Sequence, residues 1–166
     1  TFWDIHSAVS MDLFKGACRV KNIEASCFIS PFIEENELVI APDKGALNRA
    51  RDSAGPTNPV LTMSKVRNPD NGQITSIALL DKMPENYQGA PAIIVDDICD
   101  GGRTFVGAGK ALREVLTGPL RLYVTHGIFS NGFNELLEVF DEVLVANLMY
   151  PGDTIPDRVK VIDIRP

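Results

Sequence analysis

The stretch AIIVDDICDGGRTF, residues 92–105, joins an apolar run to a short turn rich in aspartate and glycine. The run at 92–95 predicts a buried strand. Residues 103–116 predict a helix, because Phe105, Ala108 and Leu112 recur at spacings of three and four and share one face. A strand that leads through a tight turn into a helix is the repeating unit of α/β proteins. This stretch therefore predicts an α/β fold.

The residues of this turn favour a phosphorylated ligand that also carries hydroxyl groups. In open α/β sheets, ligands bind beyond the carboxyl ends of the strands. The unpaired N–H groups and the dipole of a helix start attract phosphate, and Gly101 and Gly102 let the backbone come close to it. The hydroxyl of Thr104 can donate a further bond. The neighbouring carboxylates of Asp96 and Asp97 are costly to keep together unless they meet hydroxyls or a divalent cation.

A plain structural alternative exists for the same turn. Asp100 can cap the following helix as an N-cap residue, which requires no ligand. That alternative leaves Asp96 and Asp97 without a role, so we favour the binding site. The pattern differs from the P-loop and from the glycine fingerprint of dinucleotide-binding proteins.

Apolar runs alternate with helix-like patterns on both sides of this stretch, from about residue 38 onward. Strands are predicted at 38–41, 59–63, 74–80, 120–124, 143–146 and 159–164, and helices at 45–54 and 131–140. Runs that are apolar on both faces belong in a parallel sheet covered by helices. We therefore predict three layers, with a mostly parallel central sheet flanked by helices.

Two other segments are less regular than this alternation. The first 37 residues show little periodicity, with a strand predicted at 2–5. Residues 64–73, SKVRNPDNGQ, contain Asn-Pro and Asn-Gly and predict a mobile surface loop.

The composition excludes several classes of protein. The chain has 166 residues, of which 45% are hydrophobic, so residues 1–166 suffice for one domain with its own core. Its net charge of −6 disfavours a nucleic-acid partner. No apolar run reaches the roughly 18–20 residues of a membrane span, so we expect no membrane partner. Cys18, Cys27 and Cys99 are odd in number and lack metal-site spacing, which indicates free thiols and a cytoplasmic location.

Five segments together resemble a known family. Residues 92–105 resemble the ribose 5-phosphate and 5-phosphoribosyl-diphosphate binding motif of the type I phosphoribosyltransferase-like fold. The other four resemble segments of the ribose-phosphate diphosphokinases (phosphoribosyl-diphosphate synthetases), in that family's order: DIH at 4–6, VIAPDKGALNRA at 39–50, SKVR at 64–67 and VTHGIFS at 124–130. Members of that family have two similar halves, and this chain resembles the second. Because the chain begins at Thr1 rather than Met, we expect a first half upstream.

The resemblance implies a reaction and a set of residue roles. The reaction transfers the β,γ-diphosphoryl group of ATP to the 1-hydroxyl of ribose 5-phosphate, with Mg²⁺ as cofactor and a homo-oligomer as the assembly. Asp96 and Asp97 are implied to hold the ribose hydroxyls. The 5-phosphate is implied to bind at Asp100, Gly101, Gly102 and Thr104. Lys65 and Arg67 are implied to act on the transferring diphosphoryl group, and His6 and Asp43 to bind Mg²⁺.

Alternatives stay open on the sequence alone. The shared motif also suits a phosphoribosyltransferase that consumes the activated sugar, or a non-catalytic regulatory paralogue. His6 can be a surface residue, Asp43 can cap the helix at 45–54, and His126 can bind a backbone carbonyl. Lys65 and Arg67 can be solvated charges. The chain also departs from the family pattern, because Arg103 replaces a glycine in the phosphate loop, K-R-R has become Lys-Val-Arg, and no ATP-binding segment of the first half is present.

Overall fold

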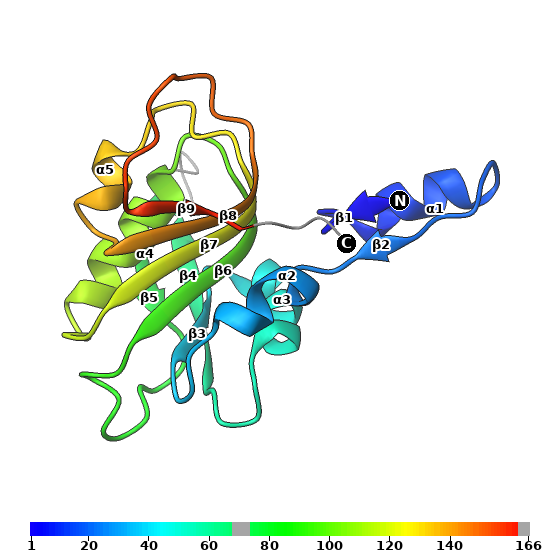
Figure 1. Cartoon of the computed structure of the whole chain (residues 1–166). Coiled ribbons are helices and arrows are strands. Elements are labelled where there is room, and N and C mark those ends of the chain that lie inside the picture. The colour runs from blue at the N-terminus through cyan, green and yellow to red at the C-terminus, as the bar shows by residue number, and fades with distance from the viewer. Residues whose placement is uncertain (68–73, 163–166) are drawn as a thin grey trace.

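A mostly parallel sheet forms the centre of the molecule, with helices on both of its faces (Figure 1). The computed structural model describes residues 1–67 and 74–162, and the side chains of all of these except residues 8, 65–67 and 74–76. The order of the strands across the described sheet is β5-β4-β3-β6-β7-β8-β9. Their bounds are β3 Leu38–Ala41, β4 Val60–Arg67, β5 Ile74–Leu79, β6 Ala92–Cys99, β7 Leu120–Gly127, β8 Glu142–Leu148 and β9 Val159–Val161.

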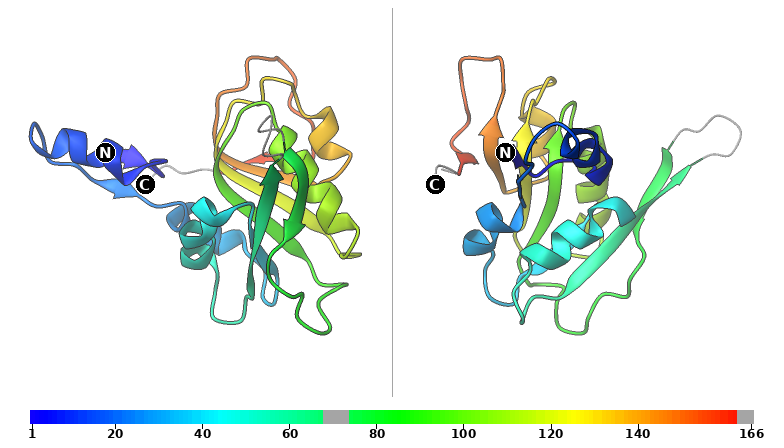
Figure 2. Two further views of the ribbon diagram at one scale, coloured as in Figure 1. Left: turned by 180° about the vertical axis from the view of Figure 1, so that it is seen from behind. Right: turned by 90° about the vertical axis from the view of Figure 1, so that its right-hand side faces the viewer.

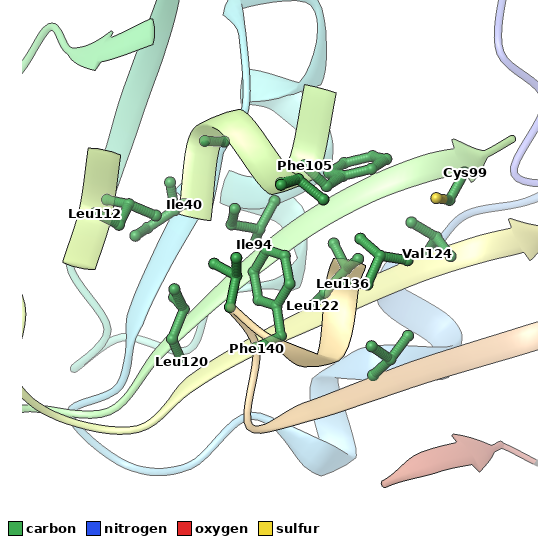
Figure 3. Close-up of a cluster of buried hydrophobic side chains, with 14 of the residues drawn as sticks. Ile40, Ile94, Cys99, Phe105, Leu112, Leu120, Leu122, Val124, Leu136 and Phe140 are labelled. Atoms are coloured by element: carbon green, nitrogen blue, oxygen red, sulfur yellow. The ribbon is translucent and has the colours of Figure 1, made fainter. Parts of the chain in front are cut away.

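Alternation along the strands divides the core between the two faces of the sheet. Ile40, Ile94 and Leu122 belong to one buried cluster, which also holds side chains of α4 (Arg103–Arg113) and α5 (Asn134–Leu137). Figure 3 shows this cluster between α4, α5 and the strands. The neighbouring residues Val39 and Ile93 face the other way, into a cluster with α2 (Ser26–Ile29) and α3 (Leu47–Ser53). Because strand side chains alternate between faces, a sheet that is apolar on both sides needs both helical layers. The prediction of three layers is confirmed.

The connections that follow β3 and β6 run on opposite faces of the sheet. From β3 it runs through the 3₁₀ turn η2 (Lys44–Ala46) and α3 on one face to β4, and from β6 it runs through α4 on the opposite face to β7. Both pairs of strands are parallel, and β3 and β6 are themselves parallel neighbours. The two connections therefore diverge at the carboxyl ends of β3 and β6 and leave a crevice there. Such a switch point is where open α/β sheets bind ligands.

An N-terminal arm, residues 1–23, projects from the sheet at the carboxyl ends of its strands (Figures 1 and 2). Its strands β1 (Phe2–Trp3) and β2 (Asn22–Ile23) pair in parallel, with α1 (Ala8–Lys15) between them. Ser7 caps α1 by accepting a hydrogen bond from the N–H of Val9 at 3.3 Å. After the arm, α2 and the 3₁₀ turn η1 (Ser30–Phe32) lead back to β3. Of the helices in the described part of the chain, none has the length and apolar character to cross a membrane.

Some predicted elements differ from those observed. Residues 64–67 are part of β4, which pairs antiparallel with β5, so the predicted loop at 64–73 is wrong over these four residues; 68–73 lie outside the described residues. The helix predicted at 131–140 is reduced to α5; it cannot begin before Gly132, which has positive φ, and it ends at Leu137. The strand predicted at 92–95 continues to Cys99, since β7 pairs with it to that point.

Candidate functional site

A pocket of about 660 Å³ opens at the carboxyl ends of β3 and β6, where the two connections diverge. The turn after β3 lines one side of it and the turn after β6 lines the other, while the arm contributes His6. Eight residues that the sequence analysis singled out lie in its wall: His6, Asp43, Asp96, Asp97, Asp100, Gly101, Gly102 and Thr104. Most of them lie within residues 96–104, and the parallel pairing of β3 with β6 brings Asp43 beside that segment.

Asp96 and Asp97, here called the acid pair, lie on an open edge of β6. The register of β3 with β6 runs from Leu38 opposite Ala92 to Ile40 opposite Ile94, whereas β7 pairs with β6 as far as Cys99. The acid pair therefore extends past the end of β3 and lines the pocket. A side chain from α3 can reach it across this edge.

Asp97 is buried and Asp96 is partly buried, so their neighbouring charges are poorly screened by water. The side chain of Asp97 is 5% exposed and that of Asp96 is 18% exposed. Burial, followed by the neighbouring charge of Asp97, raises the pKa of Asp96 to about 7. The N–H of Asp97 donates to Oδ1 of Asp96 at 2.9 Å, which offsets part of this rise. Two carboxylates in this position favour a ligand that donates hydrogen bonds or carries positive charge.

The loop of residues 100–104, here called the phosphate loop after its predicted ligand, leads directly into α4. Gly102 occupies the N-cap position with φ of 76°, a left-handed conformation that glycine adopts at little cost. Gly102 rather than Asp100 is therefore the N-cap residue, and it has no side chain to cap the helix, so the alternative in which Asp100 is the N-cap is wrong. The first N–H groups of α4 are thus left for water or an anion, at the positive end of the helix dipole.

The loop after β7 supports the phosphate loop from behind. Asn131 donates from Nδ2 to the carbonyl of Gly101 at 2.9 Å, and the N–H of Ser130 donates to the carbonyl of Asp100 at 3.2 Å. The N–H groups of Ile128 and Phe129 both donate to the carbonyl of Cys99, at 2.8 and 3.2 Å. These bonds fix the carbonyls of Cys99, Asp100 and Gly101. Sequence analysis quoted residues 124–130 only as a resemblance and missed Asn131.

Cys99 lies under the same turn. It is fully buried, and burial raises the pKa of its thiol to about 12. A thiol that stays protonated is a poor nucleophile, so the structure supports a packing role for Cys99.

The two residues predicted to bind Mg²⁺ lie in the pocket wall, each with other contacts. Nδ1 of His6 lies 2.5 Å from Oδ2 of Asp97, and the His6 side chain is 84% exposed. Oδ1 of Asp43 accepts hydrogen bonds from the N–H groups of Gly45 and Ala46, at 2.9 and 3.3 Å. The capping alternative for Asp43 is therefore confirmed, though for the turn η2. Within the described residues no group of three or more His, Cys, Asp or Glu side chains is arranged to hold a metal ion.

The predicted catalytic pair and His126 have different outcomes. Lys65 and Arg67 belong to β4, in register with Ile77 and Ile74 of β5, and their side chains lie outside what the structure describes.

Nδ1 of His126 accepts a hydrogen bond from Nδ2 of Asn147, 3.2 Å away. Its Nε2 therefore carries the hydrogen and donates to the carbonyl of Trp3 at 2.8 Å. The alternative in which His126 binds a backbone carbonyl is confirmed, and that bond ties the arm to β7.

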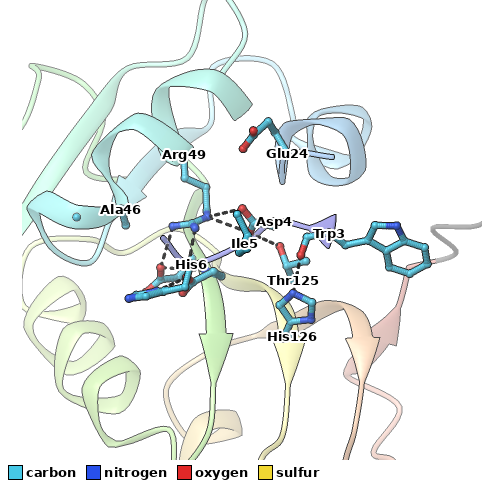
Figure 4. Close-up of polar contacts among 12 residues, drawn as sticks. Trp3, Asp4, Ile5, His6, Glu24, Ala46, Arg49, Thr125 and His126 are labelled. Carbon is cyan, nitrogen blue, oxygen red and sulfur yellow. Dashed lines mark hydrogen bonds and ion pairs between the residues drawn. The ribbon is translucent and has the colours of Figure 1, made fainter. Parts of the chain in front are cut away.

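Arg49 and Asp4 are polar residues of the site that sequence analysis did not assign. Arg49 comes from α3 and reaches the acid pair, while Asp4 comes from the arm and contacts Arg49 (Figure 4). Both lie within segments that the sequence analysis quoted, at 39–50 and 4–6. Their place in these segments was the only sequence signal, because their contact joins residues 45 apart, which no local pattern reports.

Comparison with known proteins identifies the family. A family model described as the phosphoribosyl synthetase-associated domain matches residues 73–165. The chain belongs to this family. The matched region contains both the acid pair and the phosphate loop, and the predicted family is confirmed. The roles of individual residues stay predictions.

Individual relatives agree with the phosphoribosyl synthetase-associated assignment. The chain is 31% identical to a ribose-phosphate pyrophosphokinase of Pyrococcus furiosus over 173 residues, covering 98% of this chain and 56% of the relative. It is 29% identical to one of Hyphomonas neptunium over 160 residues, covering 93% of this chain and 48% of the relative. The chain thus spans about half the length of these curated relatives.

A solved structure supports the fold. The crystal structure of a phosphoribosylpyrophosphate synthetase from Mycobacterium smegmatis superimposes with a TM-score of 0.76 at 24% identity. The match covers 96% of this chain and 52% of that chain. The predicted fold is therefore confirmed.

Proposed function

We propose that this chain is the ribose 5-phosphate-binding half of a ribose-phosphate diphosphokinase, with residues 1–166 forming one domain of a two-domain enzyme. In the proposed reaction the 1-hydroxyl of ribose 5-phosphate attacks the β-phosphorus of ATP. The bond from the β-phosphorus to the oxygen bridging it to the α-phosphorus breaks, AMP leaves with that oxygen, and the hydroxyl proton is released. The products are 5-phosphoribosyl diphosphate and AMP.

One observation carries the proposal: the acid pair and the uncapped start of α4 line the same pocket. A sugar monophosphate presents a dianion at one end and hydroxyl groups at the other. The N–H groups of the phosphate loop suit the dianion, and the carboxylates of Asp96 and Asp97 suit the hydroxyls. The nearly full-length similarity of the chain to ribose-phosphate pyrophosphokinases supports this reaction over a phosphoribosyltransferase or a regulatory paralogue.

The catalytic and metal residues of the proposal follow the resemblance. Lys65 and Arg67 would neutralise the transferring diphosphoryl group, since phosphoryl transfer depends on positioning and charge more than on covalent chemistry. His6 and Asp43 would take part in holding Mg²⁺, which usually keeps waters and substrate phosphates among its ligands and so needs few protein groups. The carboxylate-rich wall of the pocket supports a cation there. Bound Mg²⁺ would spread the charge of the phosphate oxygens.

The remaining parts of the proposal concern the setting of the enzyme. ATP is the diphosphoryl donor, the assembly is a homo-oligomer and the location is cytoplasmic. The free cysteines support the location. The family resemblance supports the donor and the assembly.

The test is titration calorimetry of ribose 5-phosphate with the full-length protein. Asp96→Asn combined with Asp97→Asn should abolish binding, because an amide has one uncharged acceptor oxygen and binds hydroxyls more weakly than a carboxylate with two. Circular dichroism should show that the fold persists. The matched control, Asp52→Asn with Asp157→Asn, makes the same charge change at exposed positions and should bind as the parent does. Undiminished binding by the acid-pair variant would overturn the site.

A further inference from the structure

Asp4 is a buried carboxylate at the point where the arm meets the sheet. It is 3% exposed and has φ of 45°, a conformation that residues other than glycine seldom adopt. Oδ2 of Asp4 accepts a hydrogen bond from the hydroxyl of Thr125 on β7 at 2.6 Å. Since that hydroxyl gives its hydrogen to Asp4, the O–H of Tyr123 donates in turn to Oγ1 of Thr125, at 3.0 Å. Asp4 is therefore held in place by β7.

Arg49 connects this carboxylate to the acid pair. Its Nε donates to both oxygens of Asp4, at 3.1 and 3.0 Å. Its Nη1 lies 3.4 Å from Oδ1 of Asp96, and its Nη2 lies 3.3 Å from Oδ2 of Asp97 (Figure 4). The guanidinium plane thus has one edge on Asp4 and the other edge on the acid pair. The Arg49 side chain is 13% exposed, so water screens these contacts only weakly.

Arg49 stays protonated in this environment. Burial lowers the pKa of Arg49, but the charges of Asp4, Asp97 and Asp96 outweigh it and leave the pKa raised. A permanent planar cation with fixed donor directions can set the rotation of a carboxylate, which a flexible ammonium cannot do as well. Arg49 contacts one oxygen of each member of the acid pair, and each contact orients that carboxylate about its own bond.

We infer that Arg49 is a positioning residue of the sugar site: held by Asp4, it fixes the carboxylates of Asp96 and Asp97 in the orientation that receives two sugar hydroxyls. This inference rests on the proposed function, since it takes the ligand to be ribose 5-phosphate. It also gives the arm a part in binding, because the residue that anchors Arg49 belongs to the arm. The phosphate loop, which Arg49 does not touch in the described contacts, is independent of it.

The experiment compares two ligands that differ by one hydroxyl. Ribose 5-phosphate and 2-deoxyribose 5-phosphate present the same phosphate to the loop, but only the first offers a complete diol to the acid pair. Titration calorimetry with the full-length protein should show that Arg49→Met weakens ribose 5-phosphate about 10- to 100-fold. Affinity for the deoxy sugar should change less than threefold. Arg51→Met, an exposed arginine on the same helix, is the matched control and should leave both affinities unchanged.

A double-mutant cycle tests the role of Asp4. Asp4→Asn should also weaken ribose 5-phosphate selectively, and Arg49→Met introduced into that variant should add less than threefold, because the two residues act as one unit. Arg49→Lys, which keeps the charge but not the planar donors, should give an intermediate affinity. If Arg49→Met fails to fold, the same two-ligand comparison with Arg49→Lys takes its place.

Two results would overturn the inference while leaving the proposed function intact. One is a ribose 5-phosphate affinity within threefold of the parent in Arg49→Met. The other is an equal loss for both sugars, which would mean general damage rather than orientation of the acid pair. Failure of the parent protein to bind ribose 5-phosphate, or undiminished binding by the acid-pair variant, would instead overturn the proposed function itself.

Discussion

Arg121 donates two hydrogen bonds to the carboxylate of Glu37, from Nε to Oε1 at 2.9 Å and from Nη2 to Oε2 at 2.5 Å. Glu37 is fully buried just before β3, and Arg121 lies at the start of β7. The N–H of Glu34 also donates to Glu37, at 2.9 Å. The pair therefore links β3 and β7 at the amino ends of the strands, opposite the pocket.

The first prediction follows from this ion pair. Arg121→Met leaves the buried Glu37 charge without its main partner and should lower the free energy of unfolding by about 3–5 kcal/mol. Urea denaturation at neutral pH measures it. Lys110→Met, at an exposed position of α4, is the control and should change stability by less than about 0.5 kcal/mol. A loss below about 1 kcal/mol for Arg121→Met would show that Glu37 relaxes into water.

The second prediction concerns the pH dependence of stability. The pKa of Asp96 is raised from an ordinary 3.8 to about 7 in the folded protein, first by burial and then by Asp97. Its ionisation therefore favours the unfolded chain, and the folded protein loses stability as pH rises from about 4 through 7. Asn cannot ionise and does not carry this penalty.

Asp96→Asn should accordingly gain stability relative to the parent as pH rises, with an advantage about 1–2 kcal/mol larger at pH 8 than at pH 5. Thermal melts at the two pH values measure the difference. Asp52→Asn alters an exposed carboxylate on α3 and provides the comparison. An advantage that is the same at both pH values would mean that Asp96 does not titrate in this range.

The third prediction concerns the phosphate loop. Gly102 has φ of 76°, and an added Cβ would have only ordinary contacts with Leu136, at 3.4 Å, so the cost of Gly102→Ala is conformational. We expect a stability loss of about 1 kcal/mol and, under the proposed function, at least a tenfold loss of ribose 5-phosphate affinity. Gly16→Ala, where an added Cβ meets nothing within 4 Å, should leave both unchanged. Denaturation and calorimetry on the same samples test the pair.

The fourth prediction addresses the proposed catalytic lysine. Lys65→Ala in the full-length enzyme should lower turnover by orders of magnitude and leave ribose 5-phosphate affinity almost unchanged, since a cation aimed at a transition state acts that way. Lys82→Ala, an exposed lysine after β5, should have parental turnover. A loss of affinity without a loss of turnover would make Lys65 a binding residue.

Local sequence patterns predicted much of the fold and the turn of the phosphate loop. The strands at 38–41, 92–95, 120–124 and 143–146 were all confirmed, because an apolar run buried on both faces is a property of neighbouring residues. The glycine turn that begins α4 was also readable, since its chemistry lies within a few consecutive positions. Of the arm, only the strand predicted at 2–5 was found, as the shorter β1; α1 and β2 were missed, because such short elements lack clear periodicity.

Sequence alone was enough to establish the layered α/β fold, the acid pair and the glycine turn, since each depends on residues close together in the chain. The partners of the acid pair could not be predicted from the sequence. Arg49 meets Asp4 and Asp96 because β3 ends before β6 does and because Asp4, near the start of the arm, is bonded to β7. Those contacts depend on strand order and on where each strand ends, which long-range packing sets rather than local periodicity.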